Sequence, residues 1–396
     1  MTIRPVVTGI GIVAPNGIGT AAYWDAILAS RSGIRRLTRV DADRYPVQFG
    51  GEIDGFVAED HVPGRIVVQT DRWTHFGLAA TAMALADAGT DPAAFDEYDM
   101  AVVTASSSGG TEFGQREIER LWNTGPRAVG AYQSIAWFYA ATTGQVSILH
   151  GMRGPCRVIA TEQAGGLDAV AEARRVIGRG TPMVVAGGTD ASLCPYGLVA
   201  QTANGQLSRA GAYVPFDRRA RGYLPGEGGA MMIIQDPGQA HGPGYGVIAG
   251  YAATFDPPPC SGRPRNLRRC VELALDDAGI GPDDVDAVFA DAHGTVDADR
   301  AEIEALSEVF GPSGVPVTAP KTMTGRLYAG GAALDLATAL LALRHQVIPP
   351  TVGIRHPAYH DRLDLVGSPR KTALDTALVL ARGYGGFNAA TVVATS

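Results

Sequence analysis

Apolar runs of strand length alternate with segments of helical period along the first half of the chain. The apolar runs occupy residues 6–13, 100–104, 158–160, 183–187 and 230–234. Between them, residues 74–88 and 167–177 repeat their apolar positions at helical spacing. Strands that alternate with helices in this way are typical of βαβ units. The pattern therefore predicts an α/β protein.

The alternation returns after a glycine- and proline-rich stretch at residues 236–246. The second series predicts strands at 247–253, 285–291 and 376–382, and helices at 267–278, 301–310 and 332–343. We therefore expect two similar βαβ halves, residues 1–240 and 241–396.

Two matching triplets support the repeat. Ala164-Gly165-Gly166 and Ala329-Gly330-Gly331 each follow an apolar strand and open a predicted helix. Small residues allow a helix to pack closely on its neighbours, and helix N-termini can also form a shared binding site. The sequence leaves both interpretations open.

Composition restricts the class of protein. The 396 residues are 46% hydrophobic, which is ample for a large core, and the net charge of −7 comes without a long basic run. We therefore expect no nucleic-acid partner. No apolar run reaches the roughly 18 residues of a membrane span. Residues 1–4 lead directly into a predicted strand, so we expect no signal peptide and a cytoplasmic protein.

Cysteine and lysine are both rare. Cys156, Cys194, Cys260 and Cys270 form no CxxC pair and lack the spacing of metal ligands, so neither a disulfide framework nor a metal site is indicated. We also expect no cofactor. Of the 33 basic residues only Lys321 and Lys371 are lysines. A compact ammonium group is therefore a candidate requirement at one of these positions, although coincidence remains open.

The segment 158–170 reads as a strand, a sharp turn and a buried helix, with Gln163 at the entrance of the helix. A cysteine at this position would be activated by the helix dipole, which favours the thiolate. An amide has no comparable nucleophilic form at neutral pH. Covalent acyl transfer from residue 163 is therefore excluded.

Five further motifs extend this layout to nearly the whole chain, in a fixed order. They are Val7-Thr8-Gly9-Ile10-Gly11, the pair Pro215-Phe216-Asp217 and Gly226-Glu227-Gly228, Asp291-Ala292-His293-Gly294-Thr295, Lys321-Thr322-Met323-Thr324-Gly325, and Gly383-Tyr384-Gly385-Gly386-Phe387-Asn388. In this order they resemble the β-ketoacyl synthases of the thiolase superfamily. The resemblance implies a thiolase-like fold with α/β/α/β/α layers.

In working ketosynthases the resemblance implies a Cys-His-His triad with a supporting lysine. Carried over to this sequence, the cysteine falls on Gln163, the first histidine on His293, the lysine on Lys321 and the second histidine on Arg326. Two triad positions are changed, and residues 161–169, TEQAGGLDA, closely resemble the chain-length factors of type II polyketide synthases. We therefore expect a subunit that does not elongate chains itself.

His293 departs from this picture because it keeps the HGT motif of an active ketosynthase. It is either a structural histidine or part of a polar pocket with Gln163 and Lys321. In the second case an amide N–H at residue 163 could polarise a malonyl thioester as it decarboxylates, which would be a priming activity.

The resemblance also implies partners: a catalytic ketosynthase α subunit in a heterodimer, and an acyl carrier protein that delivers malonyl groups. The expected tunnel helix places Thr111, Gly114 and Ile118 on one face. These residues are small where related factors for shorter chains are bulky, so we expect a deep tunnel and a long product, unless they merely pack against the sheet. The aromatic segment 132–140 belongs either to the dimer interface or to a buried helix.

Three rival functions remain. The chain could be a catalytic ketosynthase with unusual residues, or a purely structural ketosynthase partner that forms no tunnel. A thiolase or degradative enzyme of the same fold would need cysteines at active positions, and none of the four cysteines falls on one.

Overall fold

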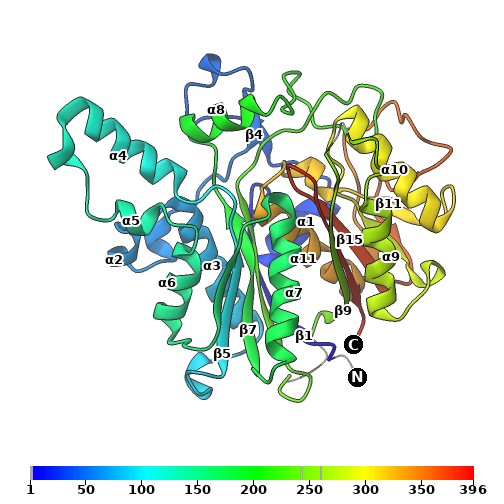
Figure 1. Cartoon of the computed structure of the whole chain (residues 1–396), viewed down its shortest axis with the longest axis horizontal. Coiled ribbons are helices and arrows are strands. Elements are labelled where there is room, and N and C mark those ends of the chain that lie inside the picture. The colour runs from blue at the N-terminus through cyan, green and yellow to red at the C-terminus, as the bar shows by residue number, and fades with distance from the viewer. Residues whose placement is uncertain (1–2, 241, 243, 259–260) are drawn as a thin grey trace.

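The computed structural model describes residues 3–240, 242, 244–258 and 261–396. Its ribbon is built around one large mixed sheet (Figure 1). Each half of the chain contributes five main strands to that sheet. The strands of the first half are β1 (Val6–Ala14), β5 (Met100–Ala105), β6 (Cys156–Ile159), β7 (Met183–Asp190) and β8 (Gly228–Gln235). Those of the second half are β9 (Gly246–Phe255), β10 (Ala287–Phe289), β11 (Pro316–Thr318), β15 (Thr376–Arg382) and β16 (Phe387–Ala394).

The two halves have the same strand order. It is β1-β8-β7-β5-β6 in the first half and β9-β16-β15-β10-β11 in the second, where β13 (Asp364–Leu365) adds an outer strand. The parallel and antiparallel pairings match position by position. β1 and β9 join the halves by pairing Val6 with Val247. The repeat expected from the sequence is therefore present in the topology.

Helices form the outer and central layers. They include α3 (Arg72–Asp87), α7 (Gly165–Ile177), α9 (Leu267–Ala278), α10 (Val296–Phe310) and α11 (Ala329–His345). α3 covers the first half-sheet and α9 the second, whereas α7 and α11 contact each other and strands of both halves. Three hydrophobic cores fill the spaces between these layers. The layered, thiolase-like α/β/α/β/α class is confirmed.

The repeat extends to single atoms. In β1, a Cβ atom at Gly9 would lie 2.2 Å from the carbonyl oxygen of Ala84 in α3. In β9, a Cβ atom at Gly250 would lie 2.3 Å from the carbonyl oxygen of Ala274 in α9. Each outer helix therefore approaches its half-sheet at a glycine, because any side chain there would separate the two layers.

The described residues also form six further α-helices and five short strands. They are α1 (Thr20–Leu28), α2 (Gly64–Val67), α4 (Thr111–Thr124), α5 (Gln133–Ala136), α6 (Ala141–His150), α8 (Pro195–Ala203), β2 (Gly17–Ile18), β3 (Ile34–Arg36), β4 (Phe49–Gly51), β12 (Val347–Ile348) and β14 (Arg370–Lys371). In the described part of the chain, no helix is long and apolar enough to cross a membrane.

Helix starts are where expectation and structure differ most. α11 begins at Ala329 rather than at 332, because the buried carboxylate of Asp190 accepts a hydrogen bond from the Ala329 N–H at 3.0 Å and satisfies the free helix end. Of the two alternatives for residues 132–140, dimer interface or buried helix, the structure contradicts the buried helix. Only a single turn, α5, forms there, and Tyr132, Phe138 and Tyr139 are exposed.

Candidate functional site

The turn before α7 has the strained backbone of an elbow. Glu162 has a φ of 54°, a left-handed conformation that is unfavourable for a residue with a side chain, and it opens a 3₁₀ turn, Glu162–Ala164, between β6 and α7. The Glu162 carboxylate accepts a hydrogen bond from the Tyr384 N–H at 2.9 Å, which ties the turn to the loop 383–387. Burial raises the pKa of Glu162, although nearby Arg326 acts in the opposite direction.

The side chain of Gln163 lies in the contact between the two central helices. It is 1% exposed, and a Cβ atom at Gly331 in α11 would lie 2.3 Å from its Nε2. Neither Nε2 nor Oε1 has a hydrogen-bond partner within the described residues. Gly166 meets α11 just as closely, since its Cβ would lie 2.3 Å from the Ala333 nitrogen. The two glycine triplets therefore serve close helix packing, with the Gln163 amide between them.

Arg326 occupies the interior as a fixed cation. Its guanidinium donates to the carbonyl and Oδ1 of Asp291, at 2.9 and 3.0 Å, and to the carbonyl of Arg382 at 3.0 Å. Burial acts to raise the pKa of Asp291, but Arg326 and Lys321 together hold that pKa well below its ordinary value. A guanidinium has no acceptor atom and cannot be deprotonated in a protein, so Arg326 cannot do the work of a histidine.

His293 is held as a neutral ring. Its Nε2 lies 3.1 Å from Oε1 of Gln206 and its Nδ1 lies 3.2 Å from Oγ1 of Thr295, while Tyr223 packs against the ring edge-on. Burial, reinforced by Arg326, lowers the pKa of His293 to about 3. Both nitrogens therefore have partners, as a structural histidine requires. The ring also lines a cavity of about 720 Å³ next to the loop 383–387.

Lys321 has a different partner from the one that the resemblance implies. Its Nζ forms a buried ion pair with Asp335 of α11 at 2.6 Å. Burial raises the pKa of Asp335, and the ammonium group of Lys321 counteracts it. Lys321 therefore supports α11 and not Arg326, the residue to which the resemblance carried the second histidine. A buried ion pair in this narrow space explains why a compact lysine stands here.

The three residues expected to line the tunnel have different surroundings along α4. Thr111 is buried and lines a cavity of about 390 Å³, which extends to Glu162 beside Gln163. Gly114 and Ile118 do not line that cavity. Gly114 is covered by the ring of Trp137, and Ile118 is 41% exposed. The role of these residues in product length stays a prediction.

Five aromatic side chains line this cavity, and the sequence motifs did not indicate that they lie together. Trp137, Tyr139, Tyr196, Tyr328 and Phe387 line it together with Thr111. They come from four separate segments, so no local pattern marks them. The sequence singled out three of them, two in the aromatic run at 132–140 and Phe387 in the motif at 383–388.

The described residues outside this site offer no candidate for metal binding and no activated thiol. Among the residues that the structure describes, no group of three or more histidine, cysteine or acidic side chains could hold a metal ion. Cys194 and Cys270 are buried, which raises the pKa of both thiols, that of Cys270 to about 12. Cys156 is an exposed free cysteine, and Cys260 lies outside the described residues.

Comparison with known proteins agrees with this site. The N-terminal domain model of the beta-ketoacyl synthases matches residues 4–240 and the C-terminal domain model matches residues 245–355. The chain belongs to the beta-ketoacyl synthase family. Within the family it is a chain-length factor, or ketosynthase beta subunit, of the type II polyketide synthases, as curated relatives at 54% and 58% identity indicate.

Two relatives illustrate the branch. The chain is 58% identical to the tetracenomycin polyketide synthase ketoacyl synthase beta subunit of Streptomyces glaucescens, covering 98% of this chain and 97% of that protein. It is 54% identical to the actinorhodin beta-ketoacyl synthase 2 of Streptomyces coelicolor, covering 98% of each. Identity falls to 31% with a polyketide beta-ketoacyl synthase 1 of Streptomyces halstedii.

Solved structures share the fold over the full length. The ishigamide ketosynthase/chain length factor superposes with a TM-score of 0.90 at 24% identity, and each chain is covered completely. A ketosynthase from a type II polyketide synthase, solved with its acyl carrier protein, superposes with a TM-score of 0.88 at 25% identity, again over all of both chains. The chain therefore keeps the family scaffold over its whole length.

Proposed function

We propose that this chain sets the length of a long poly-β-ketone without elongating it, as the partner of a catalytic ketosynthase. The observation that carries the proposal is Gln163, a buried amide at the elbow where an acyl-accepting thiol would stand. Arg326, fixed by Asp291 and Arg382, removes the second triad function as well. Elongation therefore takes place on the partner.

The exposed edge of the sheet supports the heterodimer. β6 is the terminal strand of the first half-sheet, and its residues Cys156 and Arg157 are exposed. A sheet edge presents unpaired backbone groups to another chain. Large apolar side chains of the same half of the chain are exposed too, namely Trp122, Tyr132, Phe138, Ile148 and Val199. A ketosynthase α subunit is the partner that this surface fits, since relatives of the chain are named as beta subunits.

Further properties follow from the same proposal. An acyl carrier protein brings malonyl groups to the complex, as the solved relative with its bound carrier protein suggests. The protein works in the cytoplasm, needs no cofactor, and divides near residue 240 into two halves. The unpaired amide of Gln163 is consistent with help in malonyl decarboxylation, but it contacts Gly331 and lines neither of the two cavities described above.

Thr111 provides the test of length control. In the complex reconstituted with the ketosynthase and the carrier protein, we expect Thr111→Phe to shorten the product by one or more two-carbon units, because the ring fills the cavity that Thr111 lines. Thr111→Val has nearly the same volume and should keep the native length. Product masses measure both.

The rival functions give different results. A purely structural partner would show a lower yield after Thr111→Phe with an unchanged product length. A catalytic ketosynthase would take up an acyl label on the isolated chain, which Gln163 forbids.

A further inference from the structure

Gly114 is glycine for a reason that its backbone does not explain. It lies in the second turn of α4 with ordinary helical geometry, and its φ is not positive. Glycine is less favourable than alanine inside a helix. A Cβ atom here would lie 2.0 Å from Cε3 and 2.1 Å from Cζ3 of Trp137. The indole ring of Trp137 therefore occupies the volume that a side chain at residue 114 would need.

The same indole faces the cavity. Trp137 lines the space of about 390 Å³ together with Thr111 and Tyr196, and its ring packs at an angle of 61° to the ring of Tyr196, 6.2 Å away. Gly114 does not line this space. The indole ring of Trp137 therefore contacts Gly114 and also lines the cavity. It connects residue 114 with the cavity.

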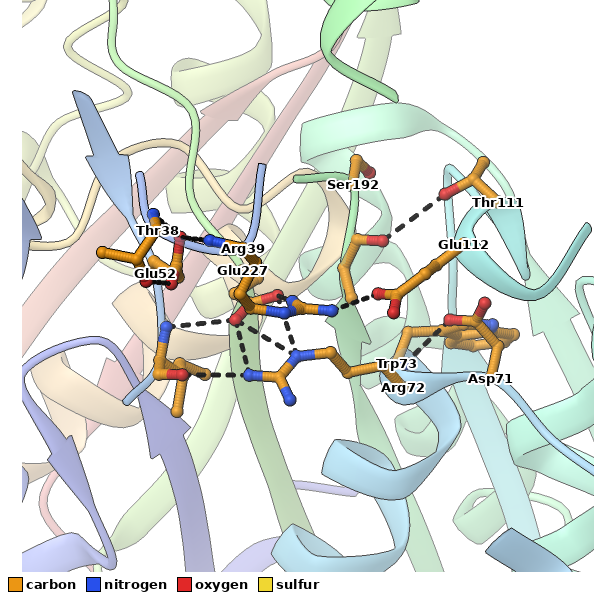
Figure 2. Close-up of polar contacts among 12 residues, drawn as sticks. Thr38, Arg39, Glu52, Asp71, Arg72, Trp73, Thr111, Glu112, Ser192 and Glu227 are labelled. Atoms are coloured by element: carbon orange, nitrogen blue, oxygen red, sulfur yellow. Dashed lines mark hydrogen bonds and ion pairs between the residues drawn. The ribbon is translucent and has the colours of Figure 1, made fainter. Parts of the chain in front are cut away.

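The first turn of α4 is tied to the core of the protein by a network of charged side chains. Figure 2 shows Arg39 between two carboxylates, Glu112 of α4 and the fully buried Glu227. Arg39 lies 3.1 Å from Glu227, and Arg72 binds the same carboxylate at 2.8 Å. Glu112 and Arg39 are only partly buried, with 23% and 27% of their side chains exposed, but Arg39 is itself held by the buried Glu227. This network therefore holds the start of α4 against the core.

Two further contacts hold the start of α4. Asp71 caps α3 by accepting from the Trp73 N–H (Figure 2). It also accepts from the Phe113 N–H at 2.6 Å. On the other side, Gln115 accepts from the Tyr196 N–H at 2.8 Å. A side chain added at residue 114 would therefore displace the ring of Trp137 rather than the helix.

We propose that Trp137 determines the usable depth of this cavity, and that residue 114 acts on product length only through the Trp137 ring. A larger residue at 114 pushes the indole into the cavity, and a smaller residue at 137 deepens it. The proposal rests on the proposed function, because it assumes that the growing chain occupies this cavity.

A double-mutant cycle in the reconstituted complex tests the proposal. We expect Gly114→Ala to shift the product toward shorter chains, and Trp137→Phe and Trp137→Ala to shift it toward longer chains by at least one two-carbon unit. Gly114→Ala combined with Trp137→Ala should give the same product as Trp137→Ala alone. Tyr98→Ala is the matched control, since Tyr98 is 63% exposed, does not line the cavity and should leave the length unchanged.

The outcomes separate the two proposals. If Gly114→Ala shortens the product equally with and without the indole, or if neither Trp137 variant changes product length while Thr111→Phe does, the role of Trp137 is refuted. If Thr111→Phe also leaves the length unchanged, length control by this chain is refuted. Should Trp137→Ala fail to assemble with its partner, Trp137→Phe combined with Gly114→Ala gives the same comparison.

Discussion

Single residues decide the chemistry of this site through charge and hydrogen bonding. His293 keeps its place in the motif, yet burial and the neighbouring Arg326 hold the ring neutral, with a pKa of about 3. Gln206 and Thr295 satisfy its two nitrogens. The HGT motif is therefore kept, but the imidazole ring of His293 stays uncharged and both of its nitrogens have hydrogen-bond partners.

The neutral state of His293 predicts a pH effect on stability. In the unfolded chain its pKa returns to 6.5, so below that pH the unfolded state binds a proton that the folded state refuses until about pH 3. The stability of the wild type relative to His293→Asn should therefore be constant above pH 7 and fall as the pH drops from about 6.5 toward 4, by up to about 1.4 kcal/mol per pH unit. Urea unfolding at a series of pH values measures the difference. A difference that does not vary with pH would contradict a neutral ring.

At the scale of elements, close approach between helix and strand sets where glycine must stand. α3 meets β1 at Gly9 and α9 meets β9 at Gly250, at equivalent places in the two halves. Gly144 in α6 is different, because no other atom lies within 4 Å of its Cβ position. Substitution of Gly9 or Gly250 tests the packing between helix and sheet. Substitution of Gly144 tests helix propensity alone.

We expect Gly9→Ala and Gly250→Ala to destabilise the protein to a similar extent, by about 1–3 kcal/mol each, since a methyl group would overlap backbone atoms of the covering helix. Gly144→Ala is the control and should stabilise the protein by about 0.5–1 kcal/mol, because it only improves helix propensity. Chemical denaturation gives all three values. A large difference between the two strand variants would argue against the structural repeat at these positions.

At the scale of the whole molecule, the first half of the chain exposes both a sheet edge, at β6, and a large aromatic side chain on α4. α4 extends away from the body of the molecule near α5 (Figure 1), and Trp122 on α4 is 81% exposed. Strand β6 leaves an edge of the sheet unpaired. A side chain as large as this tryptophan is an expected anchor of a protein interface.

Trp122→Asp should weaken binding of the ketosynthase partner by roughly tenfold or more, as loss of a central aromatic contact does. Leu273→Asp on α9 is the control, because Leu273 is also exposed but lies on the outer layer of the second half. Affinity measurements between the purified subunits distinguish the two variants. Equal binding by wild type and Trp122→Asp would place the interface elsewhere.

The sequence by itself determined the family, the two similar series of strands and helices, and the absence of a nucleophile. These properties depend on residue identity within contiguous motifs, so Gln163 excludes acyl attachment whatever its surroundings. The strand positions were predictable because buried strands are apolar runs. The helix starts were less so, because a distant residue such as Asp190 satisfies the first turn of α11.

Only the tertiary structure decided which residues meet. It directs the Gln163 amide toward Gly331 and pairs Lys321 with Asp335. It also separates Thr111, which lines the cavity, from Gly114, which is covered by Trp137. These contacts join segments that are far apart in the chain. Their geometry depends on how layers and buried charges pack together, which no local pattern of residues records.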